Sequence, residues 1–222
     1  MTLVALVNPN TAGATTAMMA AIARRTLRPE DGYEVRGVTV AAGPPMLVDE
    51  EDLRASVPRV LDAADRLLAG PDGTRVAALV VGAFGDPGAE ELRARLRVPV
   101  VGLAEAAMRE AGADGRRFGI ATTTPGLAAA IDARAARLGW SAQYTGLRLT
   151  PGDPRRLAAA PDEMTERLAE AVRACVRDDG ADAVIIGGGP LGEAAEALRD
   201  RFPVPVLGPV PAAAREAARL TS

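Results

Sequence analysis

Two stretches of the chain repeat the same pattern, and this repeat constrains the fold more than any other feature. Residues 79–111 read LVVGAFGDPGAEELRARLRVPVVGLAEAAMREA, and residues 184–217 read VIIGGGPLGEAAEALRDRFPVPVLGPVPAAAREA. Each stretch predicts an apolar strand, a glycine-containing turn, a helix, a V-P-V strand and an alanine-rich helix. Any two strand–helix–strand units share some likeness, but the matched V-P-V-x-G after each helix favours duplication. A period of about a hundred residues indicates two similar half-domains and not a solenoid.

Short apolar runs alternate with alanine-rich helical stretches along the whole chain, which is typical of a mostly parallel α/β protein. The predicted strands cover residues 2–7, 34–40, 76–81, 100–102, 118–121, 141–148, 183–186 and 206–208. The predicted helices cover residues 15–27, 58–68, 89–96, 105–111, 125–138, 161–178, 191–201 and 211–220. The acidic run at 49–52 falls between two of these elements, and we expect it to be a solvated connection.

These elements predict an α/β fold of two parallel-sheet half-domains, related by a pseudo-twofold duplication, with a ligand cleft between them. The cleft is expected where the carboxyl ends of the strands of both sheets face each other, because α/β proteins bind ligands at that edge. The first half is expected to take residues 1–112 together with the C-terminal helix at about 209–222. The second half is expected to take residues 113–208.

The residue inventory excludes several classes of function. The chain has no histidine and a single cysteine, Cys175. One chain therefore cannot build a Ser-His-Asp triad, a Cys-His dyad, a His- or Cys-based zinc site or a disulfide framework. The net charge is −3 and only 3% of residues are aromatic, which argues against a nucleic-acid partner. The longest apolar run, 76–84, is too short to span a bilayer, and the first ten residues lack a secretory signal. We expect a cytoplasmic protein without a membrane partner.

Four loops, at 8–11, 83–88, 122–124 and 188–191, each follow a predicted strand and precede a helix. Their backbone N–H groups suit a carboxylate or a planar amide, because helix N-termini favour negative charge. Taken singly, Asn10, Thr11, Thr123 and Thr124 are better interpreted as helix caps. Because the loops come in symmetric pairs, a small-anion site becomes the better prediction. The glycines at 187–189 match neither a P-loop nor a dinucleotide fingerprint, so nucleotide binding is not predicted.

Five motifs occur in order over nearly the whole chain: V-N-P-N-T at 7–11, G-A-F-G-D-P-G at 82–88, V-V-G-L-A-E-A-A at 100–107, F-G-I-A-T-T at 118–123 and I-I-G-G-G-P-L at 185–191. Together they resemble the hydantoin racemase branch of the aspartate/glutamate racemase superfamily. The resemblance implies two half-domains that face each other across a cleft, each with a cysteine just after a strand. One thiolate removes the Cα proton of a small-molecule substrate, and the other thiol delivers a proton to the opposite face. No cofactor and no metal take part, and a homo-oligomer is implied.

The resemblance also implies which residues contact the substrate through backbone amides and hydroxyls that stabilise an enolate. They are Asn10, Thr11, Ala83, Phe84, Gly85, Thr122, Thr123, Gly188 and Gly189. The two cysteine positions fall on Ala83 and Gly188, and neither residue can carry a proton. Cys175 lies inside a helical pattern and is expected to be a small buried residue. Ordinary two-thiol racemisation is therefore not expected.

Two carboxylates are candidates for replacing the thiols. Asp86 is expected either to cap a helix or to reach the cleft as a general base, and Glu105 either to start a helix or to project into the cleft. Two interpretations stay open. The leading one is an isomerase, lyase or cyclising enzyme that acts without cysteine on a small carboxylate, an amino-acid derivative or a hydantoin-like ring. The other is a non-catalytic small-molecule-binding protein or an enzyme subunit that has lost its chemistry.

Overall fold

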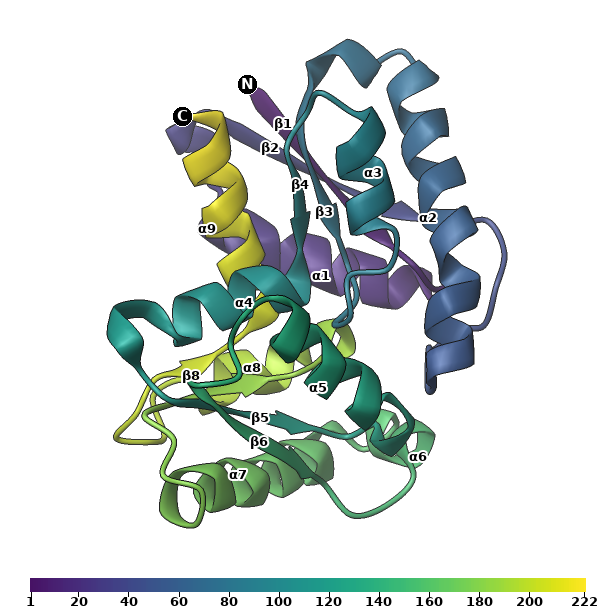
Figure 1. Ribbon diagram of the computed structural model, residues 1–222. Coiled ribbons are helices and arrows are strands. Elements are labelled where there is room, and N and C mark those ends of the chain that lie inside the picture. The colour runs from purple at the N-terminus through teal and green to yellow at the C-terminus, as the bar shows by residue number, and fades with distance from the viewer.

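The computed structural model describes residues 1–222, and its first half is built on one parallel sheet with the strand order β2–β1–β3–β4 (Figure 1). The strands are β1 (Thr2–Asn8), β2 (Tyr33–Thr39), β3 (Val76–Val81) and β4 (Val100–Gly102). The helices are α1 (Gly13–Thr26), α2 (Glu50–Ala69), α3 (Ala89–Arg95) and α4 (Leu103–Ala111).

The second half repeats this arrangement with the strand order β6–β5–β7–β8, again all parallel. Its strands are β5 (Phe118–Thr122), β6 (Tyr144–Leu149), β7 (Ala183–Ile186) and β8 (Val206–Leu207). Its helices are α5 (Ala128–Arg137), α6 (Pro154–Ala158), α7 (Pro161–Arg177), α8 (Gly192–Leu198) and the C-terminal α9 (Pro209–Thr221). The two repeated stretches occupy equivalent places, β3 to α4 and β7 to α9. The predicted α/β fold with two similar parallel sheets is confirmed.

The largest hydrophobic core lies between the two halves. Alternate residues of each strand face opposite sides of a sheet, so Val4 and Leu6 of β1 enter this shared core, whereas Leu3 and Val7 face a smaller core outside the first sheet. The shared core holds 29 buried residues, against 16 and 13 in the two outer cores. Because this shared core is as large as the two outer cores together, the halves stabilise one another by the hydrophobic effect.

The last helix of each repeat crosses to the other half. Helix α9, which follows β8 of the second half, packs on α1, β3 and β4 of the first, where Figure 1 shows it in yellow. Helix α4, which follows β4 of the first half, contacts β7 of the second, and α4 and α9 pack against each other. Both helices are rich in buried alanine, which lets their backbones approach closely. None of the helices combines the length and the hydrophobicity that a membrane-spanning segment requires.

Helix α2 begins earlier than the sequence pattern indicates. Its N-cap is Asp49, whose carboxylate accepts a hydrogen bond from the backbone N–H of Asp52 at 2.8 Å. The acidic run at 49–52 is therefore the first turn of a helix, where negative charge is favourable, and not a solvated connection. Pro58 lies inside the helix, although proline usually marks a helix start. The short helix α6 was not predicted.

Candidate functional site

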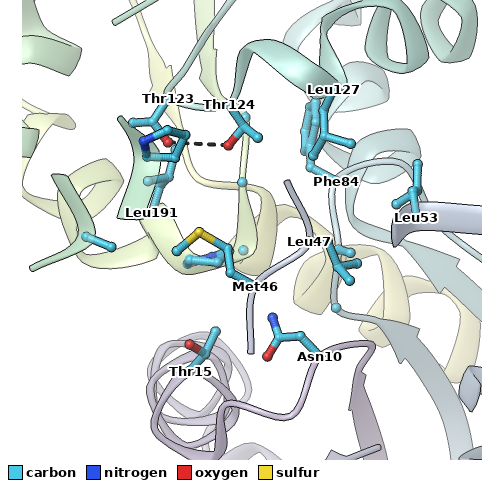
Figure 2. Close-up of a pocket in the computed structure, with 18 of the residues that line it drawn as sticks. Asn10, Thr15, Met46, Leu47, Leu53, Phe84, Thr123, Thr124, Leu127 and Leu191 are labelled. Atoms are coloured by element: carbon cyan, nitrogen blue, oxygen red, sulfur yellow. Dashed lines mark hydrogen bonds between the residues drawn. The ribbon is translucent and has the colours of Figure 1, made fainter. Parts of the chain in front are cut away.

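A cavity of about 190 Å³ lies between the two halves, at the carboxyl ends of the strands (Figure 2). Loops after β1, β3, β5 and β7 contribute to its wall, together with the loop between β2 and α2 and parts of α2, α5, α6 and α7. The lining residues are Asn10, Thr15, Met46, Leu47, Leu53, Gly82, Ala83, Phe84, Thr123, Thr124, Leu127, Ile131, Pro154, Ala158, Met164, Gly187, Gly188, Gly189, Pro190 and Leu191.

The loops after β3 and β7 meet at the centre of this cavity. A Cβ atom at Gly189 would lie 2.9 Å from the carbonyl oxygen of Gly82, and one at Gly187 would lie 3.3 Å from the ring of Phe84. Glycine at these two positions therefore allows the loops to approach each other. Gly188 lies between them with φ 168° and ψ 134°, an extended conformation that any residue adopts. Ala83 and Gly188 both line the cavity but offer no functional side chain.

Hydrogen-bond donors form part of the cavity wall. The side-chain oxygen of Asn10 accepts hydrogen bonds from the side chain of Asn8 and from the backbone N–H of Ala12, both at 2.9 Å. These contacts leave the amide NH₂ group of Asn10 without a partner, and Figure 2 shows its nitrogen directed into the cavity towards Met46. Asn8 also donates to the hydroxyl of Thr16 at 2.9 Å, so the orientation of Asn10 is held from behind.

Backbone amides add to these donors. In the loops after β3, β5 and β7, the N–H groups of the lining residues Ala83, Phe84, Thr123, Thr124 and Gly189 donate no hydrogen bond within the chain. Unpaired backbone N–H groups are costly when they are buried without a partner. They are therefore suited to the carbonyl or carboxylate oxygen of a ligand.

The cavity wall also carries apolar side chains. They belong to Met46, Leu47, Leu53, Leu127, Ile131 and Met164. No aspartate, glutamate, arginine, lysine, tyrosine or cysteine lines the cavity. The arrangement can bind a compact molecule that has both hydrogen-bond-accepting and apolar groups, but it offers no side chain that accepts or delivers a proton near neutral pH.

The structure brings together most of the residues that the resemblance places against a substrate. Asn10, Ala83, Phe84, Thr123, Gly188 and Gly189 all line the cavity. Three others lie behind the wall. The hydroxyl of Thr122 donates to the carbonyl oxygen of Gly187 at 2.7 Å. The backbone N–H of Thr11 donates to the carbonyl oxygen of Pro44 at 3.1 Å. Gly85 lines a neighbouring groove. These three support the loops and do not face the cavity.

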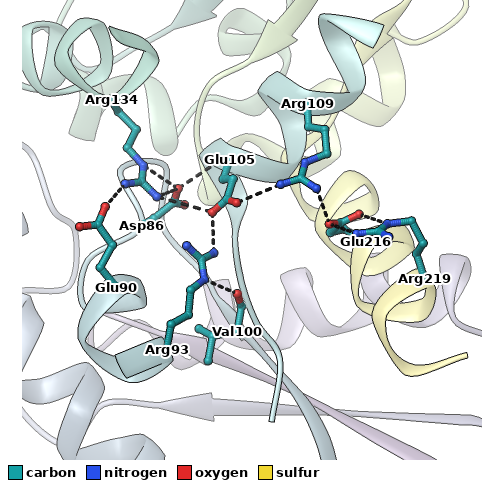
Figure 3. A network of polar contacts seen from close by, with 9 residues as sticks. All are labelled: Asp86, Glu90, Arg93, Val100, Glu105, Arg109, Arg134, Glu216 and Arg219. Carbon is teal, nitrogen blue, oxygen red and sulfur yellow. Dashed lines mark hydrogen bonds and ion pairs between the residues drawn. The ribbon is translucent and has the colours of Figure 1, made fainter. Parts of the chain in front are cut away.

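Asp86 and Glu105, the two carboxylates considered as catalytic groups, lie outside the cavity (Figure 3). The Asp86 carboxylate accepts hydrogen bonds from the backbone N–H groups of Ala104 at 2.8 Å and Glu105 at 3.0 Å, and so caps α4. It also pairs with Arg134 at 3.1 Å. Burial raises the pKa of Asp86, and Arg134 and the two amides oppose that rise.

The Glu105 carboxylate pairs with Arg93 at 2.5 Å and Arg109 at 3.2 Å. With every oxygen of Asp86 and Glu105 directed at an arginine or a helix N-terminus, neither carboxylate serves as the base that the sequence left open. Each holds elements of the fold together instead.

Several lining residues have no signature in the sequence. Met46 and Leu47 belong to the loop between β2 and α2, which extends to the second half, where a Cβ atom at Gly126 would lie 2.5 Å from the carbonyl oxygen of Val48. Such a contact joins residues far apart in the chain. The proline pair before Met46 predicts a loop, but it does not predict that this loop contacts the second half.

Cys175 lies in α7, buried against the second sheet, with its sulfur 3.8 Å from the carbonyl oxygen of Ile120. Burial raises the pKa of its thiol to about 12. Because the thiolate is the reactive form, the native protein is expected to resist iodoacetamide over hours at pH 7.5, whereas the urea-unfolded chain is expected to react fully. Intact-mass spectrometry measures both. Rapid alkylation of the folded protein would show that Cys175 is accessible.

Comparison with known proteins relates this architecture to one family. The family model described as Asp/Glu/Hydantoin racemase matches residues 4–217. A hydantoin racemase from Pseudomonas sp. (strain NS671) is 26% identical over 202 residues, which cover 91% of this chain and 79% of that protein.

Two solved structures share nearly the whole fold. The allantoin racemase of Pseudomonas fluorescens superposes with a TM-score of 0.89 at 26% identity, covering 99% of this chain and 93% of that chain. The allantoin racemase of Klebsiella pneumoniae gives a TM-score of 0.89 at 28% identity, covering 100% and 91%.

Proposed function

The chain belongs to the Asp/Glu/hydantoin racemase family, and from that premise we propose that it binds a small, neutral, hydantoin-like ring between its halves without exchanging the Cα proton of that ring. The observation that carries the proposal is the chemistry of the cavity wall. The wall carries both hydrogen-bond donors and apolar side chains, and no titratable side chain faces the cavity.

The ligand class follows from these contacts. A hydantoin ring presents carbonyl oxygens at its edge, and the NH₂ group of Asn10 and the unpaired amides near Ala83, Thr123 and Gly189 are donors for them. The apolar side chains, such as Met46 and Leu127, suit an aliphatic or aromatic substituent on the ring. A ring-opened carboxylate would be a charge without a cation beside it, which is costly to bury. The names of the relatives, hydantoin racemase and allantoin racemase, agree with a ring of this class.

The same wall supports the proposed absence of Cα proton exchange. Moving a proton from one face of a carbon atom to the other requires a base on one side and an acid on the other. We take Ala83 and Gly188 as the two positions at which the family carries its thiols, and neither side chain can exchange a proton. Donors that would stabilise an enolate are retained, so we expect the chain to bind the ring although it lacks the side chains that exchange the proton.

Binding and exchange are measured separately. We expect 5-isopropylhydantoin and 5-benzylhydantoin to raise the melting temperature of the protein, because a ligand that binds only the folded state stabilises that state. N-carbamoylvaline is expected to raise the melting temperature less. In D₂O, proton NMR should show no loss of the C5 proton beyond the buffer rate. Exchange catalysed by the wild-type chain would overturn the non-catalytic part of the proposal. Absence of any melting shift and any calorimetric heat would overturn the ligand class.

Asn10→Asp tests the donors of the cavity wall. The carboxylate keeps the acceptor for Asn8 and Ala12 but replaces the NH₂ group by an oxygen that repels a ring carbonyl. Hydantoin affinity is expected to fall at least about tenfold, the value of one hydrogen bond to a buried polar group. Isothermal titration calorimetry gives the affinity, and the melting temperature without ligand controls for folding. Equal affinities for both proteins would remove Asn10 from the site.

A further inference from the structure

Asp86 and Arg134 form a buried ion pair across the boundary between the two halves (Figure 3). One carboxylate oxygen of Asp86 lies 3.1 Å from both Nε and Nη2 of Arg134, and the two side chains are 0% and 3% exposed. Asp86 follows β3 of the first half, whereas Arg134 lies on α5 of the second. The other contacts of Arg134 also reach the first half, at Glu90 (2.5 Å) and Glu105 (3.7 Å).

Each partner lies directly behind a wall of the cavity. The backbone N–H of Asp86 donates to the carbonyl oxygen of Ala83 at 3.1 Å and closes the turn that carries Ala83 and Phe84. On the other side, Ile131 lines the cavity one helical turn before Arg134 on the same helix. The ion pair therefore connects the turn after β3 to the helix that faces it.

The backbone around the pair is shaped to receive it. Asp86 has φ 54°, a left-handed conformation that is unusual for a residue other than glycine. A Cβ atom at Gly102 would overlap the Asp86 carboxyl group, so glycine there leaves room for the buried carboxylate. Strain and desolvation of this kind persist only where the surroundings determine them. Capping α4 alone would not require a guanidinium from the other half.

We propose that Asp86 and Arg134 are positioning residues: the pair holds the turn 82–88 at a fixed distance from α5 and thereby sets the width of the cavity. The inference concerns the shape of the cavity and needs no ligand. It therefore stands or fails independently of the proposed function.

The test uses a thiol introduced by Ala83→Cys as a reporter inside the cavity. Its alkylation rate with iodoacetamide is measured by intact-mass spectrometry, alone and combined with a change at Arg134. We expect Arg134→Met to raise the rate at least tenfold, and Arg134→Lys, which keeps the charge without the guanidinium group, to raise it by a smaller factor. Arg137→Met is the matched control, because Arg137 is an exposed arginine on the same helix, and it should leave the rate within twofold.

Cys175 distinguishes a wider cavity from general loosening of the fold. It lies in the core outside the second sheet, so peptide mapping of the same samples reports whether that core has opened. A faster reaction at position 83 with Cys175 still protected supports the proposal. Equal acceleration at both thiols would assign the pair a purely structural role and overturn it, as would an unchanged rate at position 83. If Arg134→Met does not fold, the Arg134→Lys variant decides by the same criteria.

Discussion

A variant carrying both Ala83→Cys and Gly188→Cys is expected to exchange the C5 proton of a hydantoin for deuterium, whereas the wild-type chain does not. Both positions line the cavity, and the loops that carry them meet there. Ala83 has an unstrained side chain to extend. Gly188 is extended at φ 168°, and its new Cβ atom would meet the Leu191 side chain at 3.1 Å, a contact that a flexible leucine relieves by a small rotation.

The introduced activity should be weak at neutral pH and rise with pH. No cation lines the cavity, so only backbone N–H groups are available to lower the pKa of either thiol from its ordinary value of about 8.5. The thiolate fraction, and with it the exchange rate, should then increase about tenfold per pH unit until the pH reaches that pKa. Deuterium incorporation is followed by NMR, and the buffer rate at each pH is subtracted.

The two single variants are the controls for this gain. A single thiol can remove a proton and return a deuteron to the same face of the substrate. Ala83→Cys alone should therefore catalyse exchange without racemising the hydantoin, and only the double variant should abolish the optical activity of the hydantoin. A double variant that is folded and binds hydantoin, yet exchanges no faster than buffer, would show that positions 83 and 188 do not flank the Cα atom.

Asp86→Ala is expected to destabilise the protein by about 3–5 kcal/mol, the usual effect of removing one partner of a buried ion pair. The change leaves the guanidinium of Arg134 buried beside an empty site and takes two backbone N–H groups of α4 from their acceptor. Urea unfolding followed by circular dichroism gives the free energy of unfolding.

Glu90→Ala is the matched control, because Glu90 pairs with the same guanidinium but its side chain is 60% exposed. Solvent screens an exposed pair, so this change should cost less than about 1 kcal/mol. Similar losses for the two variants would mean that burial does not decide the strength of the pair.

The strands, the likeness of the two sheets and the position of the cavity could be predicted because each depends on a local or repeated pattern. Apolar runs of the right length mark β1, β3, β5 and β7, and the repeat at 79–111 and 184–217 requires the same order in both sheets. Residues that directly follow such strands, such as Asn10, Ala83 and Gly188, must gather at one edge. Their place in the cavity therefore follows from the chain order.

The roles of the charged residues could not be predicted, since they depend on contacts between distant segments. Asp86 lies three residues before α3 and resembles a cap of that helix, yet it caps α4, whose donating N–H group at Ala104 lies 18 residues further on. Its partner Arg134 is 48 residues away on a helix with one other arginine. No feature of the neighbouring sequence distinguishes Arg134 from the exposed Arg137 on the same helix.

The crossing of α4 and α9 has a consequence for how such a chain arises. A single half, folded alone, would leave the sheet face under α9 bare and would possess only one of the two loops that form the cavity. Two identical copies that lend each other their last helix would cover both faces and complete the cavity. The chain is therefore arranged like a symmetric dimer whose two subunits are joined in one chain, and the cavity occupies the place of the contact between those subunits. Once fused, the two copies can diverge, which is how one side of the site can carry Ala83 and the other Gly188.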